Sequence, residues 1–360
     1  MEHQAEFSLR RERLLSLLQE ARTGAIAITA PPNVRYLSGF TGSNAALLVT
    51  GDGTLLFTDP RYQIQASVES DCEVKIAKEP LLKALLKWAH RWRISSLGCE
   101  QNRISFQAFK ELKDGAGGIR LKPLSGIVEK LRMIKSAAEI AAITRSVELN
   151  STALQEALRH FRSSITERDL AAEIAYRMRR LGADREAFDT IVASGERSAL
   201  PHAPPTNHPI QPNQLLLVDM GATVAGYASD MTRTHAVGQP TAKTRRIYRA
   251  VLESQLAAID AAKPGLPCSS VDGAARNVLR AHGLDKQFIH STGHGLGLEI
   301  HEAPRLGRKE RTKLQPGMAV TIEPGVYVEG RLGIRIEDTV VVTSNGCRVL
   351  TPTGKELVVL

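Results

Sequence analysis

The sequence predicts an α+β fold for its C-terminal two thirds, preceded by a mixed α/β domain, and three observations support this. Helical patterns alternate with short apolar strand patterns along the 360-residue chain. The pair of helical patterns that ends at Gly182 recurs before Gly283. Several carboxylates and one histidine follow strand or turn patterns late in the chain. We therefore expect domains over residues 1–130 and 131–360, the second with two pseudo-symmetric halves around one cleft.

The N-terminal domain is predicted from helical and strand patterns in turn. Leu14 and Leu18 belong to the apolar face of an amphipathic first helix. Pro31 ends the strand that follows, and Gly51-Asp52-Gly53 is typical of a hairpin turn. The expected elements are helices over 7–22, 81–93 and 105–112, and strands over 24–29, 45–50, 54–58 and 94–99. No catalytic constellation occurs among them.

Four helices are expected in the C-terminal domain. Ser136 and Glu139 form a capping-box pattern at the start of the first helix. Gly182 and Gly283 are typical of residues that close the second and the fourth. The expected ranges are 136–161, 166–181, 244–262 and 269–282.

Two aspartates are expected to face one another across a hairpin. An apolar run ends abruptly in Asp219, and an alternating pattern surrounds Asp230. If Val224 and Ala225 form the loop, Asp219 lies directly opposite Asp230, with Cβ atoms roughly 5 Å apart. Like charges so placed repel unless a cation lies between them.

Two glutamates follow in further strand patterns. Glu323 ends an apolar strand that Pro324 stops. Residues 333–342 are predicted to form one continuous strand, in which Arg335 and Glu337 share a face because side chains alternate along a strand.

A histidine flanked by glycines completes a set of metal ligands. His294 follows Gly293 and precedes Gly295, so the backbone there can approach a ligand closely. The five candidate ligands are Asp219, Asp230, His294, Glu323 and Glu337. Two divalent cations would neutralise their four carboxylates, and oxygen-rich ligation favours Mn(II), with Co(II) and Zn(II) as alternatives. Two such ions can polarise a carbonyl and generate hydroxide, so the set predicts hydrolysis.

These segments resemble the pita-bread metallopeptidases, the group that contains methionine aminopeptidase, aminopeptidase P and prolidase. The resemblance covers about residues 130–360 and rests on VDMGATVAGYASDMTRT, IHSTGHGLGLEIHEAP, TIEPGVYV and GIRIEDTVVVT. It implies that Asp230 and Glu337 bridge two metal ions. It further implies that Asp219 binds one ion, while His294 and Glu323 bind the other. The N-terminal domain also resembles that of the family, which implies roles in assembly and in narrowing access to the cleft.

Other positions match the branch of this family that cleaves Xaa-Pro bonds. By resemblance, four of them surround the substrate and help to stabilise the reaction intermediate; these are His202, His290, His301 and Arg335. His202 or His301 is the expected donor to the oxyanion. Glu323 is the best candidate for moving a proton from the attacking water to the leaving nitrogen.

One further arginine bears on the length of the substrate. Arg305 resembles the position where some prolidases place an arginine that binds the substrate carboxylate, a task that suits a bidentate guanidinium. We therefore favour an Xaa-Pro dipeptidase, and an Xaa-Pro aminopeptidase acting on longer peptides is the alternative. A metal-independent amidinohydrolase resembling creatinase and a catalytically silent binding module fit less well, because this chain keeps all five ligands.

Composition limits the remaining possibilities. The net charge is +9, but the basic excess is spread out and no basic stripe or known motif indicates nucleic-acid binding. Four widely separated cysteines predict neither a disulfide framework nor a zinc site. No apolar run is long enough for a signal peptide or a membrane span, so we expect a cytoplasmic protein. Family analogy suggests a homodimer or a higher homo-oligomer.

Overall fold

The structure is a computed structural model that describes residues 2–162 and 165–360. The chain divides into two compact units, Met1–Arg132 and Met133–Leu360. Each unit has its own hydrophobic core. Within the described ranges, no helix combines the length and the apolar character that a membrane span requires.

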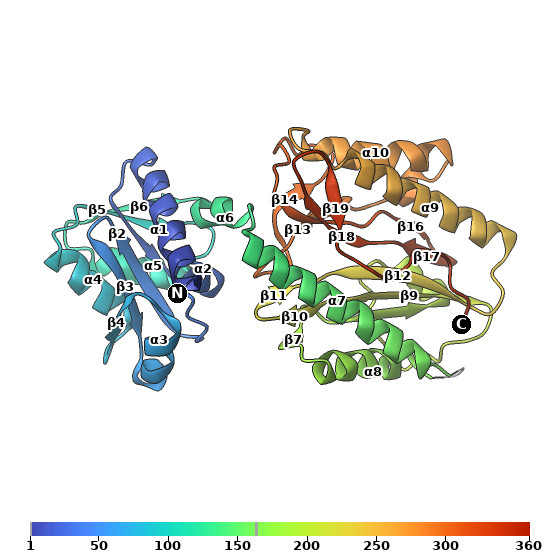
Figure 1. The fold of residues 1–360 in the computed structure, drawn as a ribbon, viewed down its shortest axis with the longest axis horizontal. Helices are drawn as coiled ribbons and strands as arrows, with labels where there is room; N and C mark the ends of the chain where they lie inside the picture. Colours follow the sequence, from blue (N-terminus) through green and yellow to red (C-terminus); the bar gives the residue numbers. More distant parts are fainter. Residues whose placement is uncertain (1, 163–164) are drawn as a thin grey trace. The chain divides into compact units, whose positions relative to one another are not determined.

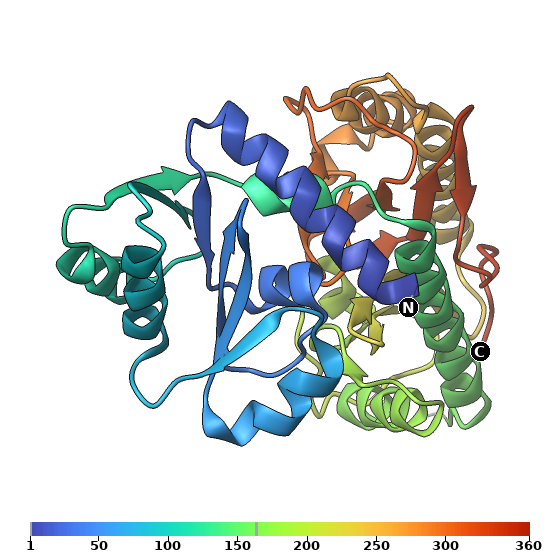
Figure 2. The same cartoon turned by 60° about the vertical axis from the view of Figure 1, so that its left-hand side comes forward.

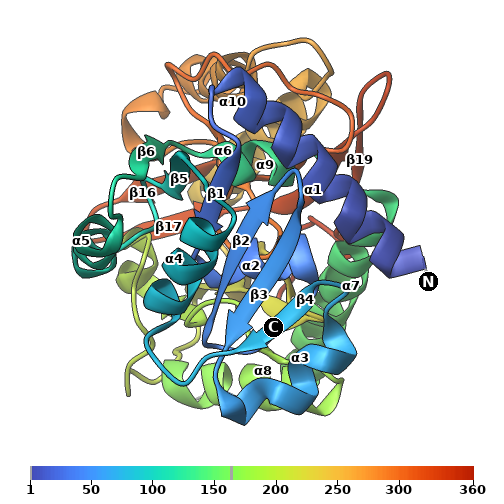
Figure 3. The same ribbon diagram turned by 90° about the vertical axis from the view of Figure 1, so that its left-hand side faces the viewer.

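A six-stranded mixed sheet forms the centre of the N-terminal unit, with the strand order β4-β3-β2-β1-β5-β6 (Figure 3). The strands are β1 (Ala25–Ile28), β2 (Ala45–Thr50), β3 (Gly53–Thr58), β4 (Glu73–Ile76), β5 (Ser96–Glu100) and β6 (Arg120–Leu124). The helices are α1 (Glu2–Glu20), α2 (Pro31–Ser38), α3 (Gln63–Glu69), α4 (Leu81–Arg91), α5 (Phe106–Gly115) and α6 (Ile127–Arg132), with a 3-10 turn η1 (Pro60–Tyr62). Helices α1 and α4 lie on opposite faces of the sheet (Figure 2).

Several elements of the N-terminal unit were not predicted, among them α2. Its sequence begins with Pro31, which suits the first turn of a helix as well as the end of a strand. Glu100 Oε2 accepts hydrogen bonds from the backbone N–H groups of Thr29 and Ala30, at 2.6 and 2.9 Å. A carboxylate from a distant strand thus fixes the backbone just before α2, whose first two residues are prolines without an N–H. Also unpredicted were α3, α6, β4 and β6.

The four helices predicted for the C-terminal unit are confirmed. They are α7 (Ala137–Arg159), α8 (Glu167–Arg180), α9 (Ala242–Ala261) and α10 (Cys268–Ala281). Ser136 and Glu139 form the predicted capping box at the start of α7. Gly182 and Gly283 follow α8 and α10 with φ values of 101° and 71°, a conformation that glycine adopts readily.

Thirteen strands in four sheets lie between these helices in the described part of the unit. The first half contains β7 (Arg185–Glu186), β8 (Ile191–Ser194), β9 (Gln214–Met220), β10 (Ala222–Val224), β11 (Tyr227–Ala228) and β12 (Met231–Val237). The second half contains β13 (Gly293–Gly295), β14 (Glu302–Leu306), β15 (Ala319–Ile322), β16 (Gly325–Val328), β17 (Leu332–Arg335), β18 (Asp338–Val342) and β19 (Cys347–Val349). The sheet orders are β12-β9-β8, β11-β10-β7, β14-β13-β15-β18-β19 and β16-β17.

Each half of the C-terminal unit places a helix pair behind its strands. Leu154 of α7 packs in one core with Val218 of β9, whereas Val251 of α9 packs in another with Val320 of β15. Figure 1 shows α7 and α8 on one side of the strands and α9 and α10 on the other. The predicted α+β fold with two similar halves is thus confirmed. The strands lie between the two helix layers, and their ends provide the positions for the site.

The predicted hairpin register was wrong by two residues. The two-residue loop is Ala225–Gly226, and both residues have positive φ, as a tight hairpin turn requires. Asp219 therefore lies opposite Thr232 rather than opposite Asp230. Because side chains alternate with a period of two, this shift keeps the two aspartates on the same face as diagonal neighbours.

The single strand predicted over residues 333–342 is also wrong. The chain forms β17 up to Arg335, leaves the ladder at Ile336 and Glu337, and enters β18 at Asp338. Strand β17 pairs with β16, whereas β18 pairs with β15 and β19. Glu337 thus lies at a junction between two sheets, which no local pattern encodes.

Candidate metal centre and substrate cavity

A cavity of about 650 Å³ in the C-terminal unit brings together every residue that the sequence indicated for the site. These residues are Asp219, Asp230, His294, Glu323, Glu337, His202, His290, His301, Arg305 and Arg335. They come from segments up to 135 residues apart in sequence. Packing of the two halves, rather than any local pattern, therefore assembles the cavity.

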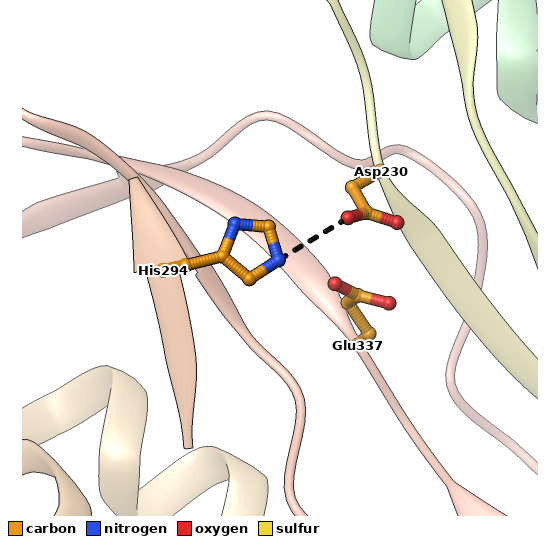
Figure 4. Close-up of side chains that lie close together, drawn as sticks. All are labelled: Asp230, His294 and Glu337. Atoms are coloured by element: carbon orange, nitrogen blue, oxygen red, sulfur yellow. Dashed lines mark ion pairs between the residues drawn. The ribbon is translucent and has the colours of Figure 1, made fainter. Parts of the chain in front are cut away.

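Three candidate ligands form the tightest group. The donor atoms of Asp230, His294 and Glu337 lie within 4.8 Å of one another (Figure 4). His294 Nε2 is 3.5 Å from Asp230 Oδ2 and 3.4 Å from Glu323 Oε1. These separations are close to those of two ligands that share one divalent ion, for which each metal–ligand bond is about 2.0–2.2 Å.

The histidine is oriented as metal-bound histidines are. His294 Nδ1 lies 3.0 Å from the carbonyl oxygen of Gly295, which can only accept a hydrogen bond. Nδ1 therefore carries the proton, and the lone pair of Nε2 faces the carboxylates of Asp230 and Glu323. Burial lowers the pKa of His294 to about 4, so the ring is neutral near pH 7. A lone pair directed at two carboxylates is repulsive unless a cation lies between them.

Two buried carboxylate oxygens lack any hydrogen-bond partner within the described parts of the chain. They are Asp219 Oδ1 and Glu337 Oε1. Leaving an anionic oxygen buried and unpaired is costly, and a cation would satisfy it. Together with the lone pair of His294, these oxygens show that the donor set fits divalent metal ions.

The pKa values of the ligand carboxylates reflect the close packing of their negative charges. Burial raises the pKa of Asp230 well above its usual range, and repulsion from Glu337 and Asp219 adds to the effect. Burial likewise raises the pKa of Glu337 well above its usual range and that of Glu323 to about 8. Without cations the cluster retains protons near neutral pH, so binding of divalent ions must release them.

Arg335 is the buried cation that organises one side of the cluster, with 2% of its surface exposed. Its Nη2 donates to Asp219 Oδ2 at 2.6 Å, and its Nε donates to Thr232 Oγ1 at 3.0 Å. Thr232 in turn donates to Glu337 Oε2 at 2.6 Å. One guanidinium thus orients two candidate ligands, one directly and one through a hydroxyl.

Tyr327 was missed by the sequence reasoning. His290 Nδ1 donates to the carbonyl of Ser291 at 2.8 Å, so its Nε2 accepts from the Tyr327 hydroxyl at 2.9 Å. The same hydroxyl accepts from Arg335 Nη1 at 2.6 Å. Burial, with Arg335 adding, lowers the pKa of His290 to about 4. Tyr327 could have been noticed as the one hydroxyl side chain after Pro324 in the segment that contains Glu323.

The remaining predicted residues line the cavity with exposed side chains. His202 and His301 are both exposed, and the His301 ring centroid lies 4.3 Å from that of His294. Partial burial lowers the pKa of His301, with His202 adding. Arg305 is also exposed and pairs with His294 in the ladder between β13 and β14.

An apolar wall of the cavity was not predicted either. It is formed by side chains from several loops and from the start of β8, namely Phe188, Ile191, Pro201, Pro204, Pro205 and Ile300. Single apolar residues scattered in this way carry no signal in a sequence, so this wall could only be found in the structure.

The chain belongs to metallopeptidase family M24, whose model matches residues 141–344. Residues 10–134 match the Creatinase/Prolidase N-terminal domain. The resemblance inferred from the motifs is thereby confirmed. Family membership makes the chain a metallopeptidase and implies divalent metal ions, for which the donor set described above is suited.

Relatives match over almost the whole chain. The Xaa-Pro dipeptidase of Pyrococcus furiosus is 38% identical over 97% of this chain and 99% of that protein. A solved structure of an Xaa-Pro dipeptidase from Bacillus anthracis is 38% identical, with a TM-score of 0.96 over 98% of this chain and 100% of that one. An X-Pro aminopeptidase from Thermotoga maritima is 35% identical, with a TM-score of 0.92 over 98% and 100%.

Proposed function

We propose that the protein hydrolyses the Xaa-Pro bond of dipeptides with two divalent metal ions, Mn(II) being the first candidate and Co(II) or Zn(II) the alternatives. The five ligands are Asp219, Asp230, His294, Glu323 and Glu337. The observation that carries the proposal is that all five line one cavity in which two buried carboxylate oxygens lack a partner. When bound, such ions supply Lewis acidity and an activated water.

The other residues of the cavity have separate tasks. Glu323, which loses its proton when divalent ions bind, takes a proton from the attacking water and passes it to the leaving nitrogen. His202 or His301 donates to the developing oxyanion from the exposed side of the cavity. Arg335 and His290, linked through Tyr327, hold the substrate side of the cluster in a fixed orientation.

Preference for proline follows from what the cavity offers around the scissile bond. An Xaa-Pro amide carries no N–H, so it loses nothing in a site without an acceptor for that hydrogen. The apolar wall, which includes Phe188, Ile191 and Ile300, provides a surface against which a pyrrolidine ring can pack.

A dipeptidase is favoured by Arg305, which lines the cavity as an exposed cation and has the chemistry to bind the proline carboxylate. The second candidate is an Xaa-Pro aminopeptidase. The similarity to the Thermotoga maritima X-Pro aminopeptidase, nearly as extensive as that to the dipeptidases, supports this alternative.

A peptide panel tests the proposal. We expect hydrolysis of Ala-Pro when Mn(II) is added, loss of activity with a chelator, and recovery on adding the metal back. Ala-Ala and Pro-Ala should be poor substrates. Comparison of Ala-Pro with Ala-Pro-Ala separates the dipeptidase from the aminopeptidase. Metal analysis should give about two ions per chain. Absence of any metal-dependent Xaa-Pro cleavage would rule out the function. The homo-oligomeric state and the cytoplasmic location stay predictions.

A further inference from the structure

A second cavity, of about 610 Å³, adjoins the substrate cavity. His290, Ser291 and Arg305 line both cavities, so the two cavities are direct neighbours on either side of these residues. Four more basic residues line only the second cavity, and one of them, Arg276, is held in an ion pair with Asp272. The other three are Lys286, Arg308 and Lys309. We call the second cavity, with its four cations Lys286, Arg305, Arg308 and Lys309, the basic groove.

The cations of the basic groove are not used by the fold. In the described parts of the chain, none of the four makes a side-chain hydrogen bond or an ion pair, and all four are exposed. The other charged residues that line the groove are engaged elsewhere. Arg276 binds Asp272, and Asp285 lies 3.8 Å from Arg280.

Glu310 is the one acid in the groove without a cationic partner. Its carboxylate accepts hydrogen bonds from the backbone N–H and the hydroxyl of Thr312, at 2.9 and 2.6 Å. These contacts lower its pKa, so Glu310 is charged. Four free cations against this single acid still leave the groove strongly positive.

The two adjoining cavities therefore differ in charge, because divalent ions would neutralise the carboxylates of the first, whereas the cations of the second have no such counter-charge. The metal-ligand side contains four carboxylates within one cavity, whereas the groove beyond Arg305 is cationic. A peptide whose second residue is proline has its amino group and scissile bond at one end. Each further residue extends the chain by about 3.3–3.6 Å, so in a longer substrate the third residue lies beyond the proline, the residue next to which Arg305 is proposed to bind.

We propose that the basic groove binds a carboxylate on the residue that follows proline, so that the enzyme prefers Xaa-Pro-Asp and Xaa-Pro-Glu peptides to neutral or basic ones. This inference rests on the aminopeptidase alternative of the proposed function, because only that activity admits a residue after proline, and it adds a substrate class to that alternative. Arg305 stands at the junction, and Lys286, Arg308 and Lys309 provide the charge beyond it. The carboxylate can come from the side chain or from the C-terminus of a tripeptide.

The test compares kcat/KM for a series of peptides that differ only after proline. The series is Ala-Pro, Ala-Pro-Asp-amide, Ala-Pro-Asn-amide, Ala-Pro-Lys-amide, and Ala-Pro-Ala with a free or amidated C-terminus. We expect the Asp peptide to exceed the Asn peptide by about three- to tenfold at low salt, which is what a few exposed ion pairs supply. The preference should shrink at high salt, because exposed charges are then screened. The two Ala-Pro-Ala forms show whether a terminal carboxylate binds as well.

Two double variants identify the groove as the cause. Arg308→Gln with Lys309→Gln should abolish the Asp-over-Asn preference while Ala-Pro cleavage is unchanged. Arg308→Glu with Lys309→Glu should reverse it in favour of the Lys peptide. The matched control is Arg145→Gln with Arg249→Gln, which removes the same charge from exposed positions on α7 and α9.

The possible results are distinguishable. Loss of the preference in the groove variants alone supports the inference. Equal loss in the control variant overturns it. So does a wild-type protein that cleaves Ala-Pro but either cleaves none of the longer peptides or does not distinguish their third residues. Failure to cleave any Xaa-Pro peptide contradicts the proposed function itself.

Discussion

Glu323 is both a candidate ligand and a candidate proton carrier, and the two tasks can be separated at the scale of one residue. Glu323→Gln keeps an oxygen that can bind a cation but cannot move a proton, whereas Glu323→Ala removes both. We expect either change to lower kcat by about a hundred- to ten-thousandfold, the usual contribution of general acid–base catalysis. Turnover is measured on Ala-Pro at saturating Mn(II), with metal content determined on the same samples.

The control for this prediction is Glu329→Gln, an exposed glutamate six residues further along, which should leave kcat unchanged. Near wild-type turnover in Glu323→Gln at full metal content would assign the proton transfer to another group.

Single residues show what the sequence could reveal at this scale. The candidate metal ligands could be predicted from the sequence because carboxylates at strand ends are chemically distinctive. The hydroxyl contacts around them could not be predicted, since Thr232 and Tyr327 are ordinary strand residues until Arg335 is placed between them.

At the scale of elements, strand β13 depends on a glycine for its position. A Cβ atom on Gly293 would lie 1.9 Å from the carbonyl oxygen of Thr321, a backbone atom that cannot move aside alone. We expect Gly293→Ala to destabilise the protein by about 1–3 kcal/mol through overpacking, and to weaken metal binding because His294 is displaced. Urea unfolding and Mn(II) titration measure the two effects.

Gly273→Ala is the matched control, because a Cβ there meets nothing within 4 Å and the residue lies inside α10. This variant should be more stable than wild type by about 0.5–1 kcal/mol, as expected for glycine replaced in a helix. Equal effects of both substitutions would show that the packing around β13 tolerates a side chain.

The same scale explains which elements were predicted correctly. Helices α7 to α10 carry their own signals in their periodicity and caps, so their ranges agree with the sequence to within two residues. The register of β9 with β12 and the break between β17 and β18 depend on partners far away in the chain, and both predictions failed.

At the scale of the whole molecule, acid sensitivity should reveal a buried histidine outside the site. His235 in β12 is 5% exposed, and neither of its ring nitrogens has a partner in the described structure. Burial, with Arg233 adding, lowers its pKa to about 4, below the usual value of 6.5. The neutral ring is thus favoured by the fold. Titration of this ring does not lower the free energy of unfolding above pH 6.5. The free energy of unfolding falls as the pH drops from 6.5 towards 4, because the unfolded protein then binds a proton that the folded protein does not.

We therefore expect His235→Leu to lose less stability than wild type between pH 7 and pH 4, by up to about 3 kcal/mol. Urea unfolding of the metal-free protein across this range is the measurement. His160→Leu, at an exposed position after α7, should leave the pH profile unchanged. Parallel profiles for wild type and His235→Leu would mean that the pKa of His235 is the same in the folded and the unfolded protein.

The sequence by itself determined the four helices of the C-terminal domain, the fold class, the family and the identity of the charged residues. Each of these features follows from local periodicity, from helix caps or from the chemistry of single residues. Only the tertiary structure decided which oxygens lack partners, how Arg335 connects Asp219 to Thr232 and Tyr327, and that a cationic groove continues from the cavity. The physical reason is that these features arise from packing between segments that do not follow one another directly in the chain, as when Arg335 binds Asp219 and Thr232 from more than a hundred residues away. Such packing leaves no periodic trace in the sequence.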